Sequence, residues 1–281
     1  MNAIEISGLC KKYDNFSLKN INLALPQGCI MGLIGENGAG KSTTIKLILD
    51  IIKRDAGKIR ILGKDILQDG KSIKNDIGVV LDEPVFPVNL NAKQINKIMK
   101  HTYSEWNEEK FFELAEKFDI DPKKAFKKYS KGMKMKLSIA VALSHNAKLL
   151  ILDEPTSGLD PVIRDEIVNI FYEFTRNPLN SVLISSHIVS DLEKLCDYVA
   201  FIHKGEILLC EEKDRLLENY CTVHCTAEEL SEIDAESVKG VKESPYGIEA
   251  IVERSAVPDG MEISPIGIEE LFVFIIKGEN K

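Results

Sequence analysis

Short apolar runs separated by longer polar stretches set the pattern of this chain. Two early segments, Ala3–Leu9 and Phe16–Leu25, alternate apolar and polar positions and predict antiparallel strands with one buried face. Later runs are apolar without alternation and predict fully buried strands, of the kind that parallel sheets contain. These later runs are 29–34, 76–81, 149–152 and 182–185. The pattern therefore indicates an α/β protein with an additional antiparallel β subdomain near its N-terminus.

Helical spacing of apolar residues accounts for much of the remaining chain. It recurs from Thr43 to Ile52 and again over Val162–Thr175. Residues 91–146 are lysine-rich and helical without a clear strand, which predicts a helical insertion into the α/β core. Farther on, Tyr198–His203 and Glu206–Cys210 predict a hairpin.

Charge divides the chain near residue 212. The net charge is −8, and residues 213–281 hold 7 basic and 15 acidic residues, so the whole excess lies in that segment. We expect a domain over 1–212 and a small acidic α+β domain over 213–281, with strands within Val238–Val257 and over Leu271–Ile276. An acidic segment is a poor ligand for nucleic acid, and no nucleic-acid partner is expected.

Composition indicates a cytosolic protein. Of its 281 residues 44% are hydrophobic, and the mean hydropathy is −0.08. No apolar run reaches 18 residues, and Met1–Glu5 lacks the basic start of a secretion signal. The six cysteines are therefore expected to be free thiols. Cys221–Cys225, with a histidine between the cysteines, is a weaker candidate for a metal site than for a strand.

The strongest chemical signal is a phosphate-binding loop between an expected strand and an expected helix. Its pattern, G-x-x-x-x-G-K-[ST], lets glycines turn the backbone so that successive N–H groups face one anion. A helix beginning near Lys41 adds its positive dipole end, the lysine reaches the β- and γ-phosphates, and the Ser42 hydroxyl ligates Mg²⁺. The loop residues are Gly35, Glu36, Asn37, Gly38, Ala39, Gly40, Lys41, Ser42 and Thr43.

A second signal is a pair of acids that ends the apolar run 149–152. In a phosphate-loop protein the first acid after such a strand holds Mg²⁺, which fits Asp153. The next, Glu154, is placed to take a proton from an attacking water. Asp-Glu-Pro also occurs at 82–84, but the pair at 153–154 follows the stronger strand and is the better catalytic candidate.

With these motifs in place, residues 1–212 resemble the nucleotide-binding subunit of an ABC transporter. The resemblance implies that Tyr13 stacks on adenine, because a phenol offers a flat apolar face. It also implies that Ser130, Lys131 and Gly132, within Tyr129–Met133, occupy the place of the family signature Leu-Ser-Gly-Gly-Gln. By the same resemblance, Asp160 in Ser157–Asp160 belongs to the loop that touches the partner subunit, and His187 is the switch histidine at the γ-phosphate.

Two positions depart from the family pattern, and both change charge. Lys131 replaces the first signature glycine and would either place a positive charge near the nucleotide or point into solvent, and we expect the former. Asp82 stands where the family has a glutamine that ligates Mg²⁺ and senses the membrane partner. A carboxylate can ligate Mg²⁺, so Asp82 joins Ser42 and Asp153 as a candidate ligand. It also removes the amide donor of the glutamine, which puts any water-positioning role in doubt.

The resemblance implies an ATPase with ATP and Mg²⁺ as ligands, in which two subunits pack head to tail and drive export through a separate polytopic membrane permease. The second subunit is the same chain or a related one. Such a subunit would be cytoplasmic and peripheral on the inner face of the cell membrane. The alternatives are a soluble ABC ATPase without a transport role and an ATP-dependent regulator that hydrolyses weakly.

Overall fold

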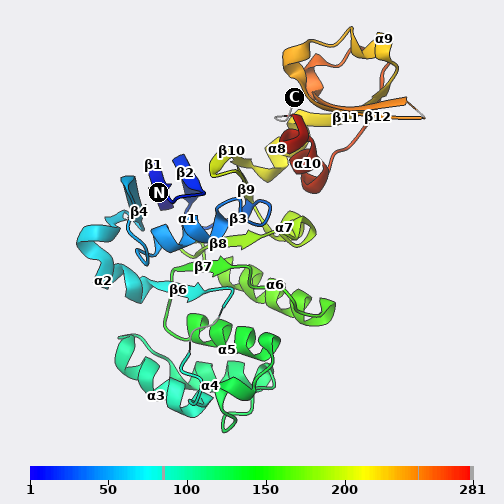
Figure 1. Cartoon of the computed structure of the whole chain (residues 1–281). Coiled ribbons are helices and arrows are strands. Elements are labelled where there is room, and N and C mark those ends of the chain that lie inside the picture. The colour runs from blue at the N-terminus through cyan, green and yellow to red at the C-terminus, as the bar shows by residue number, and fades with distance from the viewer. Residues whose placement is uncertain (84–85, 246, 279–281) are drawn as a thin grey trace.

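The structure is a computed structural model that describes residues 1–83, 86–245 and 247–278. In this part of the chain the strands form three sheets, and Figure 1 shows them at successive levels of an elongated molecule. Helices α3, α4 and α5 lie at one end of the molecule, and the last sheet lies at the other with α10 beside it. The middle of the molecule is the α/β core that sequence patterning predicted.

The central sheet has the strand order β10-β9-β3-β8-β7-β6. Its pairs are parallel except for the hairpin between β9 and β10. The middle strands are buried along their whole length, which explains why their sequences are apolar without alternation. The strands are β3 (Ile30–Ile34), β6 (Ile77–Val80), β7 (Leu149–Asp153), β8 (Ser181–Ser186), β9 (Tyr198–His203) and β10 (Glu206–Glu212). Because parallel strands end at a common edge, residues just after β3, β7 and β8 converge there.

The second sheet is antiparallel and confirms the two alternating segments near the N-terminus. Its order is β2-β1-β4-β5, with alternating buried and exposed positions along β2. Its strands are β1 (Asn2–Lys12), β2 (Ser17–Pro26), β4 (Ala56–Ile61) and β5 (Lys64–Asp65). Its apolar face shares one core with the side of the central sheet formed by residues such as Met31 and Leu33.

Helices cover the central sheet and build the insertion. Helices around the sheet are α1 (Lys41–Ile48), α2 (Ile66–Asp76), α6 (Pro161–Thr175) and α7 (Val189–Leu195). The predicted insertion contains α3 (Ala92–Thr102), α4 (Glu108–Lys117), a short 3₁₀ turn (Phe126–Lys128) and α5 (Lys131–Leu143). Its packing on the sheet includes His145, whose Nε2 lies 2.9 Å from the carbonyl oxygen of Ile77 at the start of β6.

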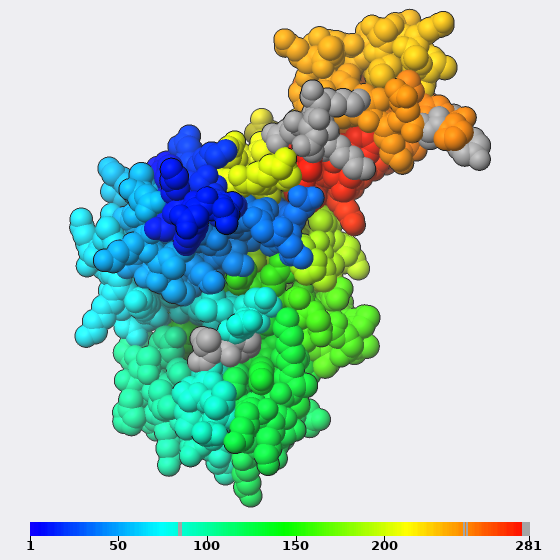
Figure 2. All heavy atoms as spheres, viewed as in Figure 1, coloured from blue at the N-terminus to red at the C-terminus, as the bar shows by residue number. Residues whose placement is uncertain are grey.

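The segment after β10 forms a third sheet of order β12-β13-β11-β14. Its elements are α8 (Lys213–Asn219), β11 (Tyr220–Cys225), α9 (Ala227–Leu230), a 3₁₀ turn (Ala235–Ser237), β12 (Val238–Ser244), β13 (Gly247–Glu253), a 3₁₀ turn (Arg254–Ala256), β14 (Glu262–Ser264) and α10 (Ile268–Gly278). Figure 2 shows that this part projects from the rest of the molecule. Cys221 and Cys225 are buried within it, whereas His224 points to the opposite, exposed face, so these three side chains do not converge on a metal.

One expectation for this segment was wrong, because residues 271–276 belong to helix α10 and not to a strand. The run is apolar on all sides and too short for periodicity to distinguish a buried strand from a buried helix. Tertiary packing decides between them: the Phe272 ring meets Phe201 of β9 edge-on, and the Ile268 N–H donates to the Glu193 carboxylate of α7. The helix is thereby attached to the α/β core.

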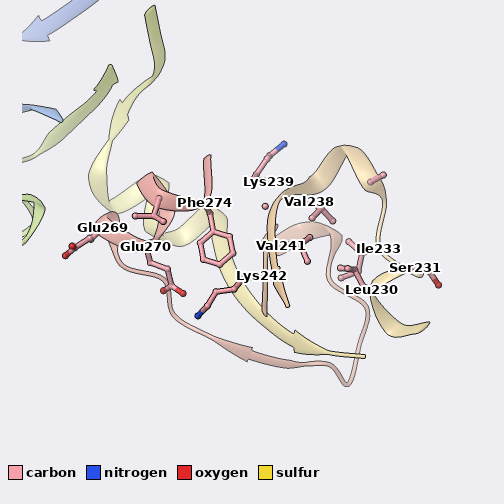
Figure 3. A pocket seen from close by; sticks show the side chains of 13 residues that line it. Leu230, Ser231, Ile233, Val238, Lys239, Val241, Lys242, Glu269, Glu270 and Phe274 are labelled. Carbon is pink, nitrogen blue, oxygen red and sulfur yellow. The ribbon is translucent and has the colours of Figure 1, made fainter. Parts of the chain in front are cut away.

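A groove of about 1110 Å³ follows the edge strand β12. Figure 3 shows its lining from α10, including Phe274 and Glu270, opposite residues near α9 such as Leu230 and Ile233. Gly240 permits the close approach of α10, because a Cβ there would lie 2.9 Å from the Phe274 ring.

Candidate active site

The phosphate-binding loop joins β3 to α1 as the sequence predicted. Gly40 directly precedes α1 with φ 117°, and a Cβ there would lie 2.6 Å from Leu18 of the antiparallel sheet. Gly38 also has positive φ. Both positions favour glycine because of their positive φ, and Gly40 also lacks the space for a side chain. The loop therefore presents its backbone at a helix N-terminus, where an anion is stabilised.

Lys41 is buried at the start of α1, and its charge is fully engaged. Its Nζ donates to the carbonyl oxygens of Gly35 at 2.7 Å and Glu36 at 3.2 Å. It also lies 3.3 Å from Oε1 of Glu154. The lysine predicted to reach the phosphates and the carboxylate predicted to act as a base are thus in direct contact.

Glu154 follows β7 with a positive φ of 50°, unusual for a residue with a side chain. Its carboxylate is buried, and its Oε2 lies 2.7 Å from Nδ1 of His187, which follows β8. The His187 side chain is 40% exposed, so its ring has one side on Glu154 and another open to solvent. The three predicted residues Lys41, Glu154 and His187 therefore form one cluster at the common edge of β3, β7 and β8.

Asp153 ends β7 and is only 3% exposed. Its Oδ1 accepts a hydrogen bond of 2.6 Å from Ser185 Oγ, its register neighbour on β8. A buried carboxylate held by one hydroxyl suits a divalent cation, because an uncompensated buried charge is costly. Among the described residues no group of three or more His, Cys, Asp or Glu side chains is placed to hold a metal. The Asp153 carboxylate with the Ser42 hydroxyl still fits Mg²⁺, because this ion commonly takes one or two carboxylates and completes its shell with water and phosphate.

The signature residues lie at the start of α5. Ser130 caps the helix, and its Oγ accepts from the Met133 N–H at 3.2 Å. Asp160 caps α6 in the same way through the Ile163 N–H. A cavity of about 280 Å³ lies between these two helix starts, lined by Ser130, Lys131, Gly132, Gly158 and Asp160 among others. Two motifs that are distant in sequence therefore share one surface.

The remaining predicted residues lie on the surface. Tyr13 is 43% exposed, and Lys11 Nζ lies over its ring, 5.5 Å from the centroid. Asp82 follows β6, and its Oδ1 lies 3.2 Å from Nζ of Lys131. Pro84, the last residue of the first Asp-Glu-Pro motif, lies outside the described residues.

Two residues at this site were not predicted as functional residues. The sequence placed Ser185 only at the end of the run 182–185, and its bond to Asp153 depends on strand register. His203 at the end of β9 is 5% exposed and lies 3.4 Å from the Glu36 carboxylate of the phosphate loop. No sequence motif marks His203, because its position follows from the close packing of the β9–β10 turn on the loop, where the Gly205 N–H donates to Ala39 O.

A phosphate loop between a parallel strand and a helix, with acids after another parallel strand of the same sheet, defines a P-loop nucleotide-binding protein. Comparison with known proteins narrows the class. Residues 18–157 match the family model described as ABC transporter. The chain is 38% identical over 208 residues to the bacitracin transport ATP-binding protein BcrA of Bacillus licheniformis, covering 73% of this chain and 68% of that protein. The chain belongs to the ABC transporter family, as an ATP-binding subunit.

Other relatives agree. The lantibiotic transport ATP-binding protein SrtF of Streptococcus pyogenes is 36% identical over 214 residues, which cover 75% of this chain and 91% of that protein. A solved structure described as the ATP binding subunit of an ABC transporter is 26% identical, with a TM-score of 0.68 over 76% of this chain and 91% of that chain. Within the described residues, none of the helices has the length and apolar character needed to span a bilayer.

Proposed function

We propose that this subunit hydrolyses ATP to ADP and phosphate and thereby drives export through a separate membrane permease. The observation that carries the proposal is the Glu154 carboxylate held between Lys41 Nζ and His187 Nδ1, at 3.3 and 2.7 Å. Relatives named as bacitracin and lantibiotic transport proteins support transport over the soluble and regulatory alternatives.

The predicted site residues have separate roles in ATP binding and hydrolysis. Backbone N–H groups of Gly35–Thr43 and the Lys41 ammonium bind the phosphates, and Tyr13 stacks on adenine. Ser42 and Asp153, with Asp82 as a third candidate, hold Mg²⁺, which supplies positive charge to the phosphate oxygens. Glu154 accepts the proton of the attacking water, and His187, in contact with Glu154, orients that carboxylate and meets the γ-phosphate.

The second half of the site comes from another subunit. One chain carries one phosphate loop and one signature surface, formed by Ser130, Lys131, Gly132 and Asp160 around the cavity between α5 and α6. Two subunits packed head to tail would place each signature surface on the nucleotide held by the other. Closure of that dimer by ATP and its reopening after hydrolysis would move the permease.

The proposal includes a division of the chain. Residues 1–212 form the nucleotide-binding domain, with a helical subdomain over about 91–146, and residues 213–281 form an accessory domain. The third sheet and its projection from the molecule support a boundary near 212. The subunit would lie in the cytoplasm, attached peripherally to the inner face of the cell membrane through the permease.

The test compares purified wild type with Glu154→Gln. General-base catalysis contributes typically about 10²- to 10⁴-fold, so the variant should lose at least about 100-fold in ATP turnover. It should also accumulate as a dimer in ATP, because closure no longer ends in hydrolysis; size-exclusion chromatography measures this. Glu166→Gln, an exposed acid on α6, is the matched control. A wild type as slow as the variant would contradict hydrolysis.

A further inference from the structure

The two positions at which the chain departs from its family pattern are in contact with each other. Asp82 follows β6 of the central sheet, and Lys131 is the first residue of α5 in the helical insertion, 49 positions later. Their charged atoms lie 3.2 Å apart, and the Lys131 and Asp82 side chains are 53% and 45% exposed. An ion pair therefore bridges the sheet and the insertion at the protein surface.

Lys131 also faces a second surface. Its stem passes Gly158, where a Cβ would lie 3.8 Å from Lys131 Cδ, and it lines the cavity shared with Ser130, Gly132 and Asp160. A lysine ammonium on a flexible four-carbon stem can change partners by rotating its own bonds. Lys131 is thus placed between a carboxylate of its own chain and the surface that we assign to the other subunit's nucleotide.

We propose that Lys131 exchanges partners when the dimer closes, leaving Asp82 for a phosphate oxygen of the nucleotide bound by the second subunit. This inference rests on the proposed head-to-tail dimer. Asp82 positions the lysine in the open subunit, and Lys131 adds a positive charge to the signature in the closed one. The exchange links nucleotide capture to the loss of the ion pair between the insertion and the segment after β6.

The strengths of the two contacts favour this direction. Exposed ion pairs contribute little free energy, so breaking the contact between Lys131 and Asp82 costs only about threefold in the equilibrium for closing the dimer. A phosphate carries more negative charge than a carboxylate, and closure of the dimer removes water around it, which strengthens the contact. Hydrogen bonds to charged groups of this kind correspond to about 10- to 100-fold in affinity.

A double-mutant cycle tests the exchange. All proteins carry Glu154→Gln so that hydrolysis is absent, and analytical ultracentrifugation gives the ATP concentration at which half of the protein is dimeric. Lys131→Met should raise that concentration about tenfold or more. Asp82→Asn should lower that concentration about threefold more when Lys131 is present than when Lys131 is replaced by Met. Any separate effect of Asp82 on Mg²⁺ is the same in both backgrounds and cancels in the cycle.

The charge-swapped variant Asp82→Lys with Lys131→Asp separates the two contacts. It retains an ion pair within the chain but offers the phosphate a negative charge, so it should dimerise more weakly than Lys131→Met alone. Lys128→Met removes the same charge from a neighbouring exposed position and should change the midpoint less than twofold. Thermal unfolding of each variant without nucleotide verifies folding.

Two results would overturn the exchange: no change on Lys131→Met, or an Asp82→Asn effect that is the same in both backgrounds. Failure of the proposed function would give a different result. In that case the Glu154→Gln protein itself would remain monomeric at every ATP concentration, whatever residue stands at 82 or 131.

Discussion

The edge of the central sheet and the start of α5 are both assigned to the nucleotide, but they are built in different ways. At the sheet edge, Lys41, Asp153 and Glu154 are buried, and each makes its polar contacts within the chain. At the start of α5, Lys131 and Asp82 are half exposed. The first region is preorganised by one chain, whereas the second presents charge outward, as expected of a surface that completes a site on another molecule.

The largest effect is expected from Lys41→Ala, which tests the preorganised region. The change removes a charge from the phosphates and leaves the buried Glu154 without its nearest cation. Charge-assisted hydrogen bonds contribute about 1.5–3 kcal/mol each, so two of them correspond to a loss of at least about 100-fold in ATP affinity. Binding of a fluorescent ATP analogue measures it. Lys46→Ala, exposed on the same helix, should leave affinity within about twofold.

A smaller effect is expected from Ser185→Ala, which removes the hydroxyl donor of the buried Asp153. Leaving a buried acceptor unsatisfied costs about 1–3 kcal/mol of folding stability. The freed carboxylate oxygen is then available to a cation, so the Mg²⁺ concentration needed for ATP binding should also change. Urea unfolding followed by circular dichroism measures the first effect. Ser186→Ala, next to it on β8, retains the Asp153 bond; an equal loss in both variants would show that Asp153 is not the reason.

The corresponding change in the exposed region is Ser130→Ala. It removes the cap of α5, and such losses cost about 1 kcal/mol. Unfolding of the insertion can be followed through Trp106, the single tryptophan, whose Nε1 donates to Asn96 Oδ1. The urea midpoint should fall less than for Ser185→Ala, and Ser130→Thr should largely restore it. A larger loss at Ser130 than at Ser185 would break the distinction between the two regions.

The sequence predicted the preorganised region better than the exposed one, for a physical reason. Buried parallel strands, a glycine-rich loop and acids at a strand end leave local patterns, so β3, β7 and the residues after them were identified directly. The bond between Asp153 and Ser185 was not identified, because it depends on which residue of β8 lies opposite the end of β7. The pairing of Lys131 with Asp82 depends on how the insertion packs on the sheet, and no local pattern reports that.

Helices α2 and α10 were the other failure. Helix α2 begins at an Asp65 cap but buries only Ile66 and Ile73, too few apolar residues for a periodic signal. Helix α10 had the opposite problem, since its apolar residues face both the third sheet and the α/β core. In both cases tertiary packing decided a structure for which local sequence was ambiguous.

The smallest predicted effect concerns the contact between the helical insertion and the central sheet. His145 lies just after α5 and is 1% exposed, with Tyr103 stacked on its ring at 3.8 Å and Ile77 O accepting from Nε2. Burial is the main cause that lowers the pKa of His145, and the nearby Lys110 lowers it further. Donation to the Ile77 and Val141 carbonyls opposes the shift, because only the protonated ring can donate to both. The neutral ring is therefore the form that stabilises the fold.

The sign of the pH dependence follows from that lowered pKa. The unfolded chain binds a proton at His145 at a higher pH than the folded chain. The stabilisation from the neutral ring is therefore complete above about pH 6.5 and is lost as the pH falls toward the pKa of His145 in the folded state. The urea midpoint reported by Trp106 should drop between pH 7.5 and 5.5 in the wild type. His145→Phe keeps a ring against Tyr103 but loses the bond to Ile77 O, so its midpoint at pH 7.5 is lower than that of the wild type. Because phenylalanine cannot titrate, the midpoint falls less over the same interval. Equal slopes in the two proteins would place the titrating group elsewhere and leave the joint between sheet and insertion insensitive to pH.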